Sequence, residues 1–327
     1  MEKLVELKNR LIRYVKQNKK QAFIRGVVLG IAFIILVVYG SLFIVMRKGR
    51  VKTVERDEVS EEVLLSENVP ILKQDQMKEH VFNVLLIGVD SRGNNDSDGR
   101  SDAMMLVSFN ELEGRATSVS FMRDSLVEVP GYGLTKLGHS YAYGGVGLTI
   151  NTLNQTYDLD IQHYVTINFE SLVHVIDKVG GVEVPITEEE AQYYRTTFGK
   201  SYIREGVNVL NGKDALMHAR NRSLGDDFGR TRRQRSVING IYRKIMENKN
   251  PADLIPIIDY CLKQVKTNMD ISLIYEMAEK VFGIENLTVM QTSIPAQGTY
   301  TDETYENMAV LKVDIEENKK ILSEFLY

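Results

Sequence analysis

The sequence predicts an α/β domain in which helices cover both faces of a central sheet. Apolar runs of strand length alternate with helical stretches from Val81 onward, and this alternation is typical of α/β folds. The run at 81–90, VFNVLLIGVD, is apolar almost throughout, as in a strand that is buried on both faces. Because no internal repeat or low-complexity tract interrupts the pattern, we expect a single domain over 81–327.

The expected elements follow in order along this domain. Strands are expected at 81–90, 103–109, 116–122, 163–167, 182–186, 287–293 and 308–313. Helices are expected after the glycine pair 144–145, at 169–181, after the turn Asn211-Gly212, and at 227–248, 272–282 and 315–326. Pro251 prevents the helix at 227–248 from continuing. The stretch between Pro185 and Tyr202 receives no assignment.

Residues 26–46 form an uncharged apolar segment near the N-terminus. A helix of these 21 residues, at about 1.5 Å rise each, spans the roughly 30 Å hydrocarbon core of a bilayer. A cleavable signal peptide has a shorter core followed by small residues, whereas Arg47, Lys48 and Arg50 follow here. We therefore expect a retained transmembrane helix, with a buried core helix as the alternative.

The charges beside this segment indicate its orientation. Residues 1–25 hold eight basic and two acidic side chains, a net charge of +6, which exceeds the positive charge of 47–52. The positive-inside rule therefore predicts a cytoplasmic tail over 1–25 and places the remainder outside the cell. We expect residues 47–80 to form a stalk and 81–327 to form the extracellular domain. With the chain total at −4, the residues after the tail carry −10.

An acidic loop, 88–102, links the first two expected strands. Asp90 follows the carboxyl end of the first strand, where α/β sheets bind ligands, and Asp102 opens the second. If the strands pair, both carboxylates converge at one end of the sheet, near Arg92 and Arg100. Mg²⁺ is usually held by one or two carboxylates with phosphate oxygens and water, so the loop fits a metal-bridged phosphate. A solvated turn is the alternative, and the EF-hand pattern is not met because its final Glu is missing.

Further polar groups stand at strand and turn ends. Arg123 follows the strand at 116–122, which suits either a solvated strand end or an anion site. Lys136 and His139 precede the glycine pair and its helix, and helix N-termini suit anions. We expect His139 to be a structural, hydrogen-bonding residue, because no second His or Cys stands at metal-ligand spacing.

The segment 218–235, HARNRSLGDDFGRTRRQR, concentrates six arginines in an acidic chain. At about 100° per residue, Arg230 and Gln234 fall on the apolar face of the helix at 227–248, and Arg233 flanks that face. Arg232 and Arg235 fall on the opposite side, where we expect solvated side chains that tolerate substitution by Gln.

A guanidinium on the apolar face needs an anionic partner, because an unpaired buried charge is costly. The partner is either Asp226 or Asp227, or a ligand phosphate whose oxygens match the guanidinium fork. Arg220 and Arg222, two residues apart, share one side of an extended stretch before the helix. Nucleic acid is a third class of partner, but the charge of −10 and the extracellular placement argue against it.

Several of these motifs together resemble the LytR-CpsA-Psr family of membrane-anchored cell-wall proteins. The resemblance covers roughly 80–248. It rests on LLIGVDSR (85–92), RSDAMML (100–106), SFMRDSLVEVPG (120–131), KLGHSYAYGG (136–145), NFESLVHVIDKVGGVEV (168–184), LNGKDALMHARNRS (210–223) and DDFGRTRRQR (226–235). It implies a central mixed β-sheet between helices, with a hydrophobic groove for a polyprenyl chain.

The same resemblance implies the activity. Family members look like transferases that move an anionic glycopolymer, such as teichoic acid or capsule, from undecaprenyl pyrophosphate to peptidoglycan, forming a phosphodiester. Two other functions remain open: a non-catalytic sensor or scaffold that binds polyprenyl phosphate, and a polyprenyl pyrophosphatase that uses water as acceptor. The expected partners are the lipid-linked polymer, peptidoglycan and the cell membrane, without nucleic acid.

Carried over to this sequence, the resemblance also implies site residues. Asp90 and Asp102 would hold Mg²⁺, or Mn²⁺ in its place. The residues that would line the pyrophosphate site are Arg92, Arg100, Arg123, Lys136, Arg220, Arg222, Arg230, Arg233 and Gln234. Asp227 would orient the arginines or help the acceptor hydroxyl to lose its proton.

Overall fold

The computed structural model describes residues 53–54, 69–72, 80–89, 101–246, 260, 264–270, 272–273, 276–277, 280 and 288–327. The chain divides into two compact units rather than the single unit expected over 81–327. The sheet unit includes Leu42–Phe169, Val265–Asp270 and Asn286–Tyr327, and the helical unit includes Glu170–Gln264.

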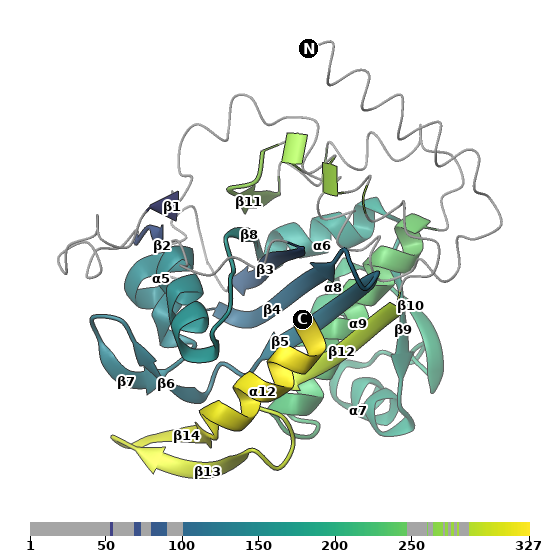
Figure 1. The fold of residues 1–327 in the computed structure, drawn as a ribbon. Helices are drawn as coiled ribbons and strands as arrows, with labels where there is room; N and C mark the ends of the chain where they lie inside the picture. Colours follow the sequence, from purple (N-terminus) through teal and green to yellow (C-terminus); the bar gives the residue numbers. More distant parts are fainter. Residues whose placement is uncertain are drawn as a thin grey trace. The chain divides into compact units, whose positions relative to one another are not determined.

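Six strands form the central sheet of the sheet unit, in the order β11-β8-β3-β4-β5-β12 (Figure 1). They are β3 (Val81–Val89), β4 (Ser101–Asn110), β5 (Arg115–Phe121), β8 (His163–Asn168), β11 (Val265–Thr267) and β12 (Thr288–Ile294). The β3–β8 and β5–β12 pairs are parallel and the other three pairs are antiparallel, so the sheet is mixed. All of the expected strands in this sheet are confirmed, and β11 is an addition.

A second sheet of four strands has the order β13-β14-β6-β7. Its strands are β6 (Ser125–Val129), β7 (Gly133–Lys136), β13 (Tyr300–Tyr305) and β14 (Met308–Val313). Only β14 was expected from the sequence. The β6–β7 hairpin carries the chain from the end of β5 to Lys136, and it thereby returns that lysine to the residues that follow β5.

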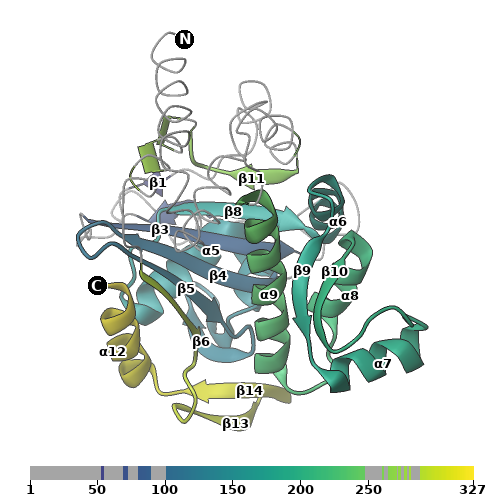
Figure 2. The ribbon, with the colours of Figure 1, turned by 90° about the vertical axis from the view of Figure 1, so that its right-hand side faces the viewer.

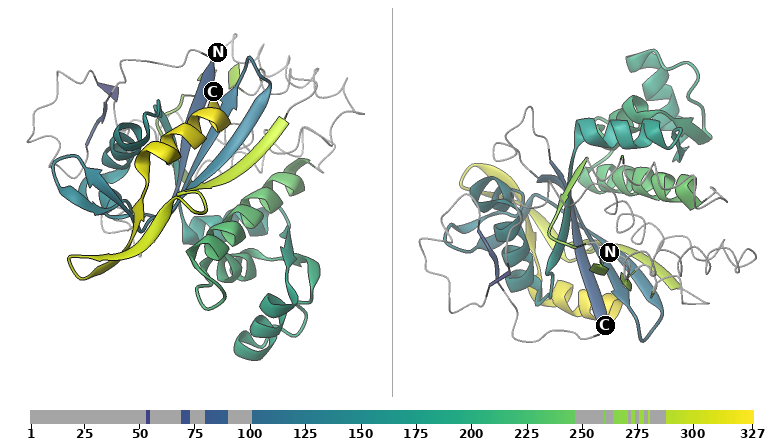
Figure 3. Two further views of the ribbon diagram at one scale, coloured as in Figure 1. Left: turned by 60° about the horizontal axis from the view of Figure 1, so that its bottom comes forward. Right: turned by 90° about the horizontal axis from the view of Figure 1, so that it is seen from above.

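Two helices, α5 (His139–Tyr157) and α12 (Ile315–Leu326), pack on one face of the six-stranded sheet (Figures 1 and 3). Leu85 and Ile87, two residues apart on β3, point to this face and join Leu148 and Leu322 in one fully buried core. We expected helices on both faces; within the sheet unit, both of these described helices lie on the same face. Their burial against β3, β4 and β5 is what makes this side of the sheet a core.

Helix α5 bends at the glycine pair. Gly145 has a φ of 68°, a conformation that favours glycine. A Cβ at Gly144 would lie 2.6 Å from Cγ2 of Val69, so only glycine fits there. Both glycines have non-helical backbone angles, so α5 consists of two helical stretches on either side of a kink. The stretch after the glycines is the helix that was expected there, and the stretch that begins at His139 is an addition.

Residues 69–72 belong to the core of the sheet unit, although we expected them within a stalk over 47–80. Val69 and Ile71 are fully buried. The Asn151 side chain of α5 accepts from Leu72 N at 2.8 Å and donates to Pro70 O at 2.9 Å. These contacts satisfy backbone groups that would otherwise be buried without partners. Strand β2 (Ile71–Leu72) also pairs in parallel with β1 (Thr53–Val54).

Between Phe169 and Met246, the described part of the helical unit consists of a two-stranded antiparallel ribbon and four helices (Figure 2). The strands are β9 (Val182–Ile186) and β10 (Gly206–Leu210), and the helices are α6 (Phe169–Lys178), α7 (Glu188–Phe198), α8 (Gly212–Arg220) and α9 (Asp227–Met246). Helix α9 runs alongside β9 and packs against α8. The sequence predicted α6, β9, α8 and α9; β10 and α7 were not expected.

Among the residues that the structure describes, no helix combines the length and apolar composition needed to cross a bilayer. The expected transmembrane segment 26–46 lies outside these residues, as do Pro251 and most of the helix expected at 272–282.

Candidate active site

Several predicted site residues lie at one edge of the six-stranded sheet. Strand β3 ends at Val89, which pairs with Ser101 near the start of β4. Phe121, at the end of β5, pairs with Met104 a few residues further along β4. The chain therefore reaches this edge just before Asp90, at Asp102 and just before Arg123. The strand pairing on which the convergence of the two aspartates depends is confirmed.

Asp102 occupies an irregular position in β4. The register changes from Gly88–Ala103 to Val89–Ser101, so Asp102 is the extra residue of a β-bulge. Bulges are common next to active sites, because they change the direction of the strand locally. Asp90, Arg92 and Arg100 lie outside the described residues, and Asp102 is described by its backbone alone.

Arg123 and Lys136 both contact a carboxylate that was not among the predicted site residues. Asp124 lies between them, with Oδ2 at 3.5 Å from Arg123 Nε and Oδ1 at 2.7 Å from Lys136 Nζ. All three side chains are about one-fifth exposed. Gly138 N donates to Arg123 O at 2.8 Å, which fixes the backbone on both sides of the cluster. The cluster carries a net positive charge in a partly desolvated position, which suits an anion.

His139 is a hydrogen-bonding residue, as expected. Its Nδ1 lies 2.9 Å from Thr135 Oγ1. Its ring lies 5.8 Å from that of Tyr143, which stacks on Tyr132 at 4.5 Å. These contacts hold the start of α5 on the β6–β7 hairpin beside Lys136.

A second basic cluster belongs to the helical unit. Arg220 ends α8, and Arg220 and Arg222 are both exposed on either side of the buried Asn221. Asn221 has an extended backbone, in which alternate residues share a side. Arg220 is the last helical residue and only Asn221 is extended, so the expectation that Arg220 and Arg222 share one side of an extended stretch stays a prediction.

The start of α9 supplies a paired arginine. Asp226 Oδ1 accepts from Gly229 N at 2.8 Å, which is the pattern of a helix N-cap. Asp227 Oδ1 lies 2.7 Å from Arg230 Nη1, so Asp227 is a protein partner of this guanidinium. The Arg230 side chain is 4% exposed and that of Asp227 is 31% exposed. The carboxylate therefore supplies the counter-charge that a nearly buried guanidinium needs.

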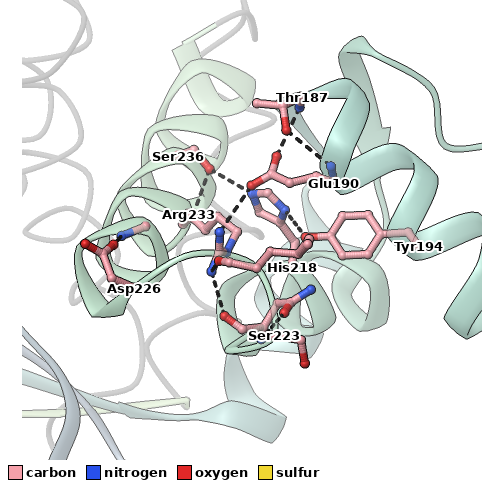
Figure 4. Close-up of polar contacts among 11 residues, drawn as sticks. Thr187, Glu190, Tyr194, His218, Ser223, Asp226, Arg233 and Ser236 are labelled. Atoms are coloured by element: carbon pink, nitrogen blue, oxygen red, sulfur yellow. Dashed lines mark hydrogen bonds and ion pairs between the residues drawn. The ribbon is translucent and has the colours of Figure 1, made fainter.

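Arg233 is more buried and makes more hydrogen bonds than expected for a residue beside the apolar face of the helix. Its side chain is 4% exposed. Nη1 donates to Glu190 Oε1 at 3.3 Å, and Nη2 donates to the carbonyls of Asn221 at 2.7 Å and Leu224 at 2.9 Å (Figure 4). Its predicted contact with a ligand phosphate stays a prediction.

Of the other polar residues predicted on this helix, one differs from the prediction in its exposure to solvent. Arg232 is exposed, as expected, and Gln234 is half-buried. Arg235 is also half-buried, whereas we expected a solvated side chain. Burial lowers the pKa of Arg235 below its ordinary value, and the nearby Arg232 adds to this effect. An apolar pattern alone does not show how far packing extends around a helix.

Small residues explain why Arg233 lies inside the helical unit. Ser236 and Gly240 share its side of α9, three and seven residues further along. A Cβ at Gly240 would lie 2.7 Å from Glu183 O, so β9 approaches the helix backbone closely there. Ser236 contacts His218 of α8 and Gly240 lies against β9, so this side of α9 is covered although its side chains are small or polar.

Both clusters suit phosphate recognition. One guanidinium group can donate two parallel hydrogen bonds to two phosphate oxygens, and a lysine adds a mobile point charge. Within the described residues, no group of three or more His, Cys, Asp or Glu side chains forms a metal site. A site built from Asp90 and Asp102 needs only two carboxylates, since phosphate and water complete the shell of Mg²⁺.

The model of the LytR_cpsA_psr family matches residues 45–324. The chain belongs to the LytR-CpsA-Psr family. The family match includes both units and the segment that contains Val69 and Ile71.

Similar proteins in this family carry names that state an activity. TagT of Bacillus subtilis (strain 168), named a polyisoprenyl-teichoic acid--peptidoglycan teichoic acid transferase, is 30% identical over 275 residues, or 81% of this chain and 83% of TagT. TagU of Bacillus licheniformis, which carries the same transferase name, is 34% identical over 231 residues, or 68% of this chain and 71% of TagU.

Solved structures of the LytR-CpsA-Psr family are also similar. TagT bound to LI-WTA has a TM-score of 0.62 at 28% identity and covers 78% of this chain and 94% of the solved chain. The family protein YwtF (TagT) with bound octaprenyl pyrophosphate lipid has a TM-score of 0.58 at 28% identity, covering 78% and 93%. The α/β architecture with a central mixed sheet agrees with these structures.

Proposed function

We propose that this protein transfers an anionic glycopolymer, of the teichoic acid or capsule class, from an undecaprenyl-pyrophosphate carrier to peptidoglycan. The observation that carries the proposal is the similarity to a family structure with bound octaprenyl pyrophosphate, together with the names of the TagT and TagU relatives. The two basic clusters supply the chemistry that a pyrophosphate requires.

In this proposal, arginines do most of the binding. Arg123 and Lys136, held by Asp124, offer one set of cationic groups. Arg220, Arg222, Arg230 and Gln234 of the helical unit offer the other. Because Asp227 Oδ1 is committed to Arg230, we assign Asp227 to the orientation of that guanidinium. Arg92 and Arg100 complete the predicted set.

Mg²⁺ fits the acidic end of the sheet, and Mn²⁺ has the same ligand preference. Asp90 and Asp102 would hold it; the pairing of Val89, which precedes Asp90 in the chain, with Ser101, which precedes Asp102, supports this assignment. The ion would neutralise pyrophosphate charge and stabilise negative charge on the leaving group.

The transfer step is a substitution at phosphorus. A peptidoglycan hydroxyl oxygen bonds to the phosphorus that carries the polymer, the bond from that phosphorus to the bridging oxygen breaks, and polyprenyl phosphate departs with this oxygen. The hydroxyl proton passes to water. Fixed cationic groups favour this reaction by positioning the phosphates and stabilising the charge that develops on the departing phosphate.

We also propose that residues 26–46 anchor the protein in the cell membrane, with residues 1–25 in the cytoplasm and the folded part outside. The length of the segment and the basic tail support this arrangement. It would hold the catalytic part near a lipid-linked substrate.

The proposal predicts that Arg123→Ala and Arg220→Ala each abolish transfer while the protein remains folded. The assay supplies purified lipid-linked polymer and peptidoglycan fragments, and it measures both the new phosphodiester and the released polyprenyl phosphate. The exposed Arg232→Gln variant is the control and should retain activity. Asp90→Asn should raise the Mg²⁺ concentration needed for half-maximal rate.

The reaction products distinguish the proposed transferase from the two alternative functions. A sensor or scaffold binds the lipid but yields neither product. A pyrophosphatase releases polyprenyl phosphate even without peptidoglycan and forms no phosphodiester. Full transfer by both Arg123→Ala and Arg220→Ala would overturn the assignment of these arginines.

A further inference from the structure

A buried network of charged and polar groups ties three helices of the helical unit together (Figure 4). Arg233 of α9 lies at its centre, with 4% of its side chain exposed. Its charge is balanced by Glu190 of α7, whose side chain is 11% exposed. A charged group this deep is stable only with a counter-charge and satisfied hydrogen bonds.

The guanidinium of Arg233 holds the loop between α8 and α9. Both N–H groups of Nη2 are used, one by Asn221 O and one by Leu224 O. These two carbonyls stand on either side of Arg222. The loop is closed further by Asn221 Oδ1, which accepts from Ser223 N at 2.8 Å. Arg233 therefore fixes the backbone from which Arg222 projects and the residue that follows Arg220.

Glu190 anchors Arg233 from the opposite side. Its Oε2 accepts from Thr187 N at 3.0 Å while Thr187 Oγ1 accepts from Glu190 N, which is a capping box at the start of α7. Its other oxygen accepts from Arg233 Nη1. One carboxylate thus starts a helix and orients an arginine 43 residues away.

A chain of hydrogen bonds joins the same helices through His218. Ser236 Oγ donates to Arg233 O at 2.7 Å, so its oxygen is left to accept from His218 Nε2 at 3.3 Å. Nδ1 of His218 then accepts from the Tyr194 hydroxyl at 2.9 Å. Burial lowers the pKa of His218 to about 4 and raises that of Tyr194 to about 12, which keeps both groups neutral.

We propose that Arg233 is a positioning residue: anchored by Glu190, it sets the loop conformation that presents Arg220 and Arg222 to a phosphate ligand. The proposal rests on the function proposed above, and it replaces a direct contact between Arg233 and the phosphate. Both terminal nitrogens of Arg233 already donate to protein oxygens, whereas Arg220 and Arg222 are exposed.

The first test measures the loop itself, without substrate. Amide hydrogen exchange of a peptide that covers 220–226 is compared in the whole protein and in two variants. Arg233→Lys keeps the charge but lacks the fork that reaches two carbonyls, and Glu190→Gln keeps an oxygen for Thr187 N while removing the counter-charge. We expect exchange at least about tenfold faster in both, because a released loop opens more often.

The control for this test is Arg232→Gln, which changes a neighbouring exposed arginine and should leave exchange at 220–226 unchanged. Exchange of a core peptide from β4 in each variant shows whether the protein is folded. If Arg233→Lys does not fold, Glu190→Gln alone decides the outcome. Unchanged exchange at 220–226 in the folded variants overturns the positioning role.

The second test asks whether Arg233 acts through Arg222. In the transfer assay, we expect Arg233→Lys to lower the rate about tenfold, since displaced catalytic groups lose rate steeply. In an Arg222→Lys background, the same change should lower the rate less than about twofold, because residues that act through one another are not additive. Full additivity indicates an independent phosphate contact by Arg233 and overturns the proposal.

The two tests fail separately. If the unmodified protein shows no transfer, the proposed function fails, and the exchange experiment still decides whether Arg233 holds the loop. If transfer is present but exchange does not respond, only the positioning role fails.

Discussion

Two histidines, His163 and His218, are held in their neutral form by burial. The pKa of each falls from 6.5 to about 4, and for His163 the nearby Asp270 opposes part of the effect of burial. Between these values the unfolded chain binds a proton that the folded chain does not. Folding stability is therefore full above about pH 6.5 and is lost as the pH falls toward about 4, by up to about 3 kcal/mol for each histidine.

His163→Phe tests this prediction, because the ring of His163 stacks on Phe82 at 4.8 Å and a phenyl ring can take the same place. We expect the unfolding midpoint of the variant to fall less between pH 6.5 and pH 4 than that of the parent. Thermal unfolding across this range is the measurement, with pH 7.5 as the reference. Equal losses in both proteins would contradict the assignment.

At the level of single residues, contacts between near neighbours in the sequence were predicted and contacts between distant residues were not. Arg230 and its acidic neighbour Asp227 were both selected, because their spacing along a helix defines their relation. Asp124 was missed, although it directly follows Arg123, because only the β6–β7 hairpin brings Lys136 back to it. Glu190 was missed because its partner is 43 residues away, and no local pattern links the two.

Among the elements, those with a strong local pattern were predicted to within a few residues. Strand β9 and helices α6, α9 and α12 fall where apolar spacing places them. Helix α7 was not assigned, although Thr187 and Glu190 form a capping-box pattern that could have identified its start. Strand β10 was missed because Val207 and Val209 are exposed and its pairing with β9 supplies the structure instead.

Helix α5 is also the element that holds residues 69–72 in place. Replacing Asn151 by Ala would leave Leu72 N and Pro70 O without their side-chain partner in a buried position. We expect a loss of about 1–3 kcal/mol in the free energy of unfolding. Gln155→Ala, at an exposed position of the same helix, is the control and should change stability little. Urea unfolding gives both values.

At the scale of the whole molecule, the fold was expected to begin at Val81, but its core includes earlier residues. A chain that starts at Val81 loses the fully buried Val69 and Ile71. Each such side chain contributes about 1.5–3 kcal/mol, so we expect a clearly lower unfolding midpoint than in a chain that starts at Arg47. In the shorter chain, Asn151→Ala should have little further effect, because its partners are gone. Equal midpoints for the two chains would contradict this placement of the core.

The family, the mixed sheet and the two groups of basic residues followed from sequence motifs. The division into two compact units did not, because strands of the sheet unit come from both sides of the helical unit along the chain. Hydrophobic patterns identify elements, but they carry no information on which elements pack together.

Because Glu190 and Arg233 form a buried ion pair, substitutions at these two positions constrain each other. A change at either position alone leaves a buried charge without its counter-charge, and the helix start at Thr187 suffers as well when Glu190 is lost. Glu190 is therefore constrained by a residue that lies 43 positions later in the chain. Glu190 thus joins the buried Ala191 and Tyr194 as a constrained position of α7, and it differs from them in that its replacement calls for a matching change at Arg233.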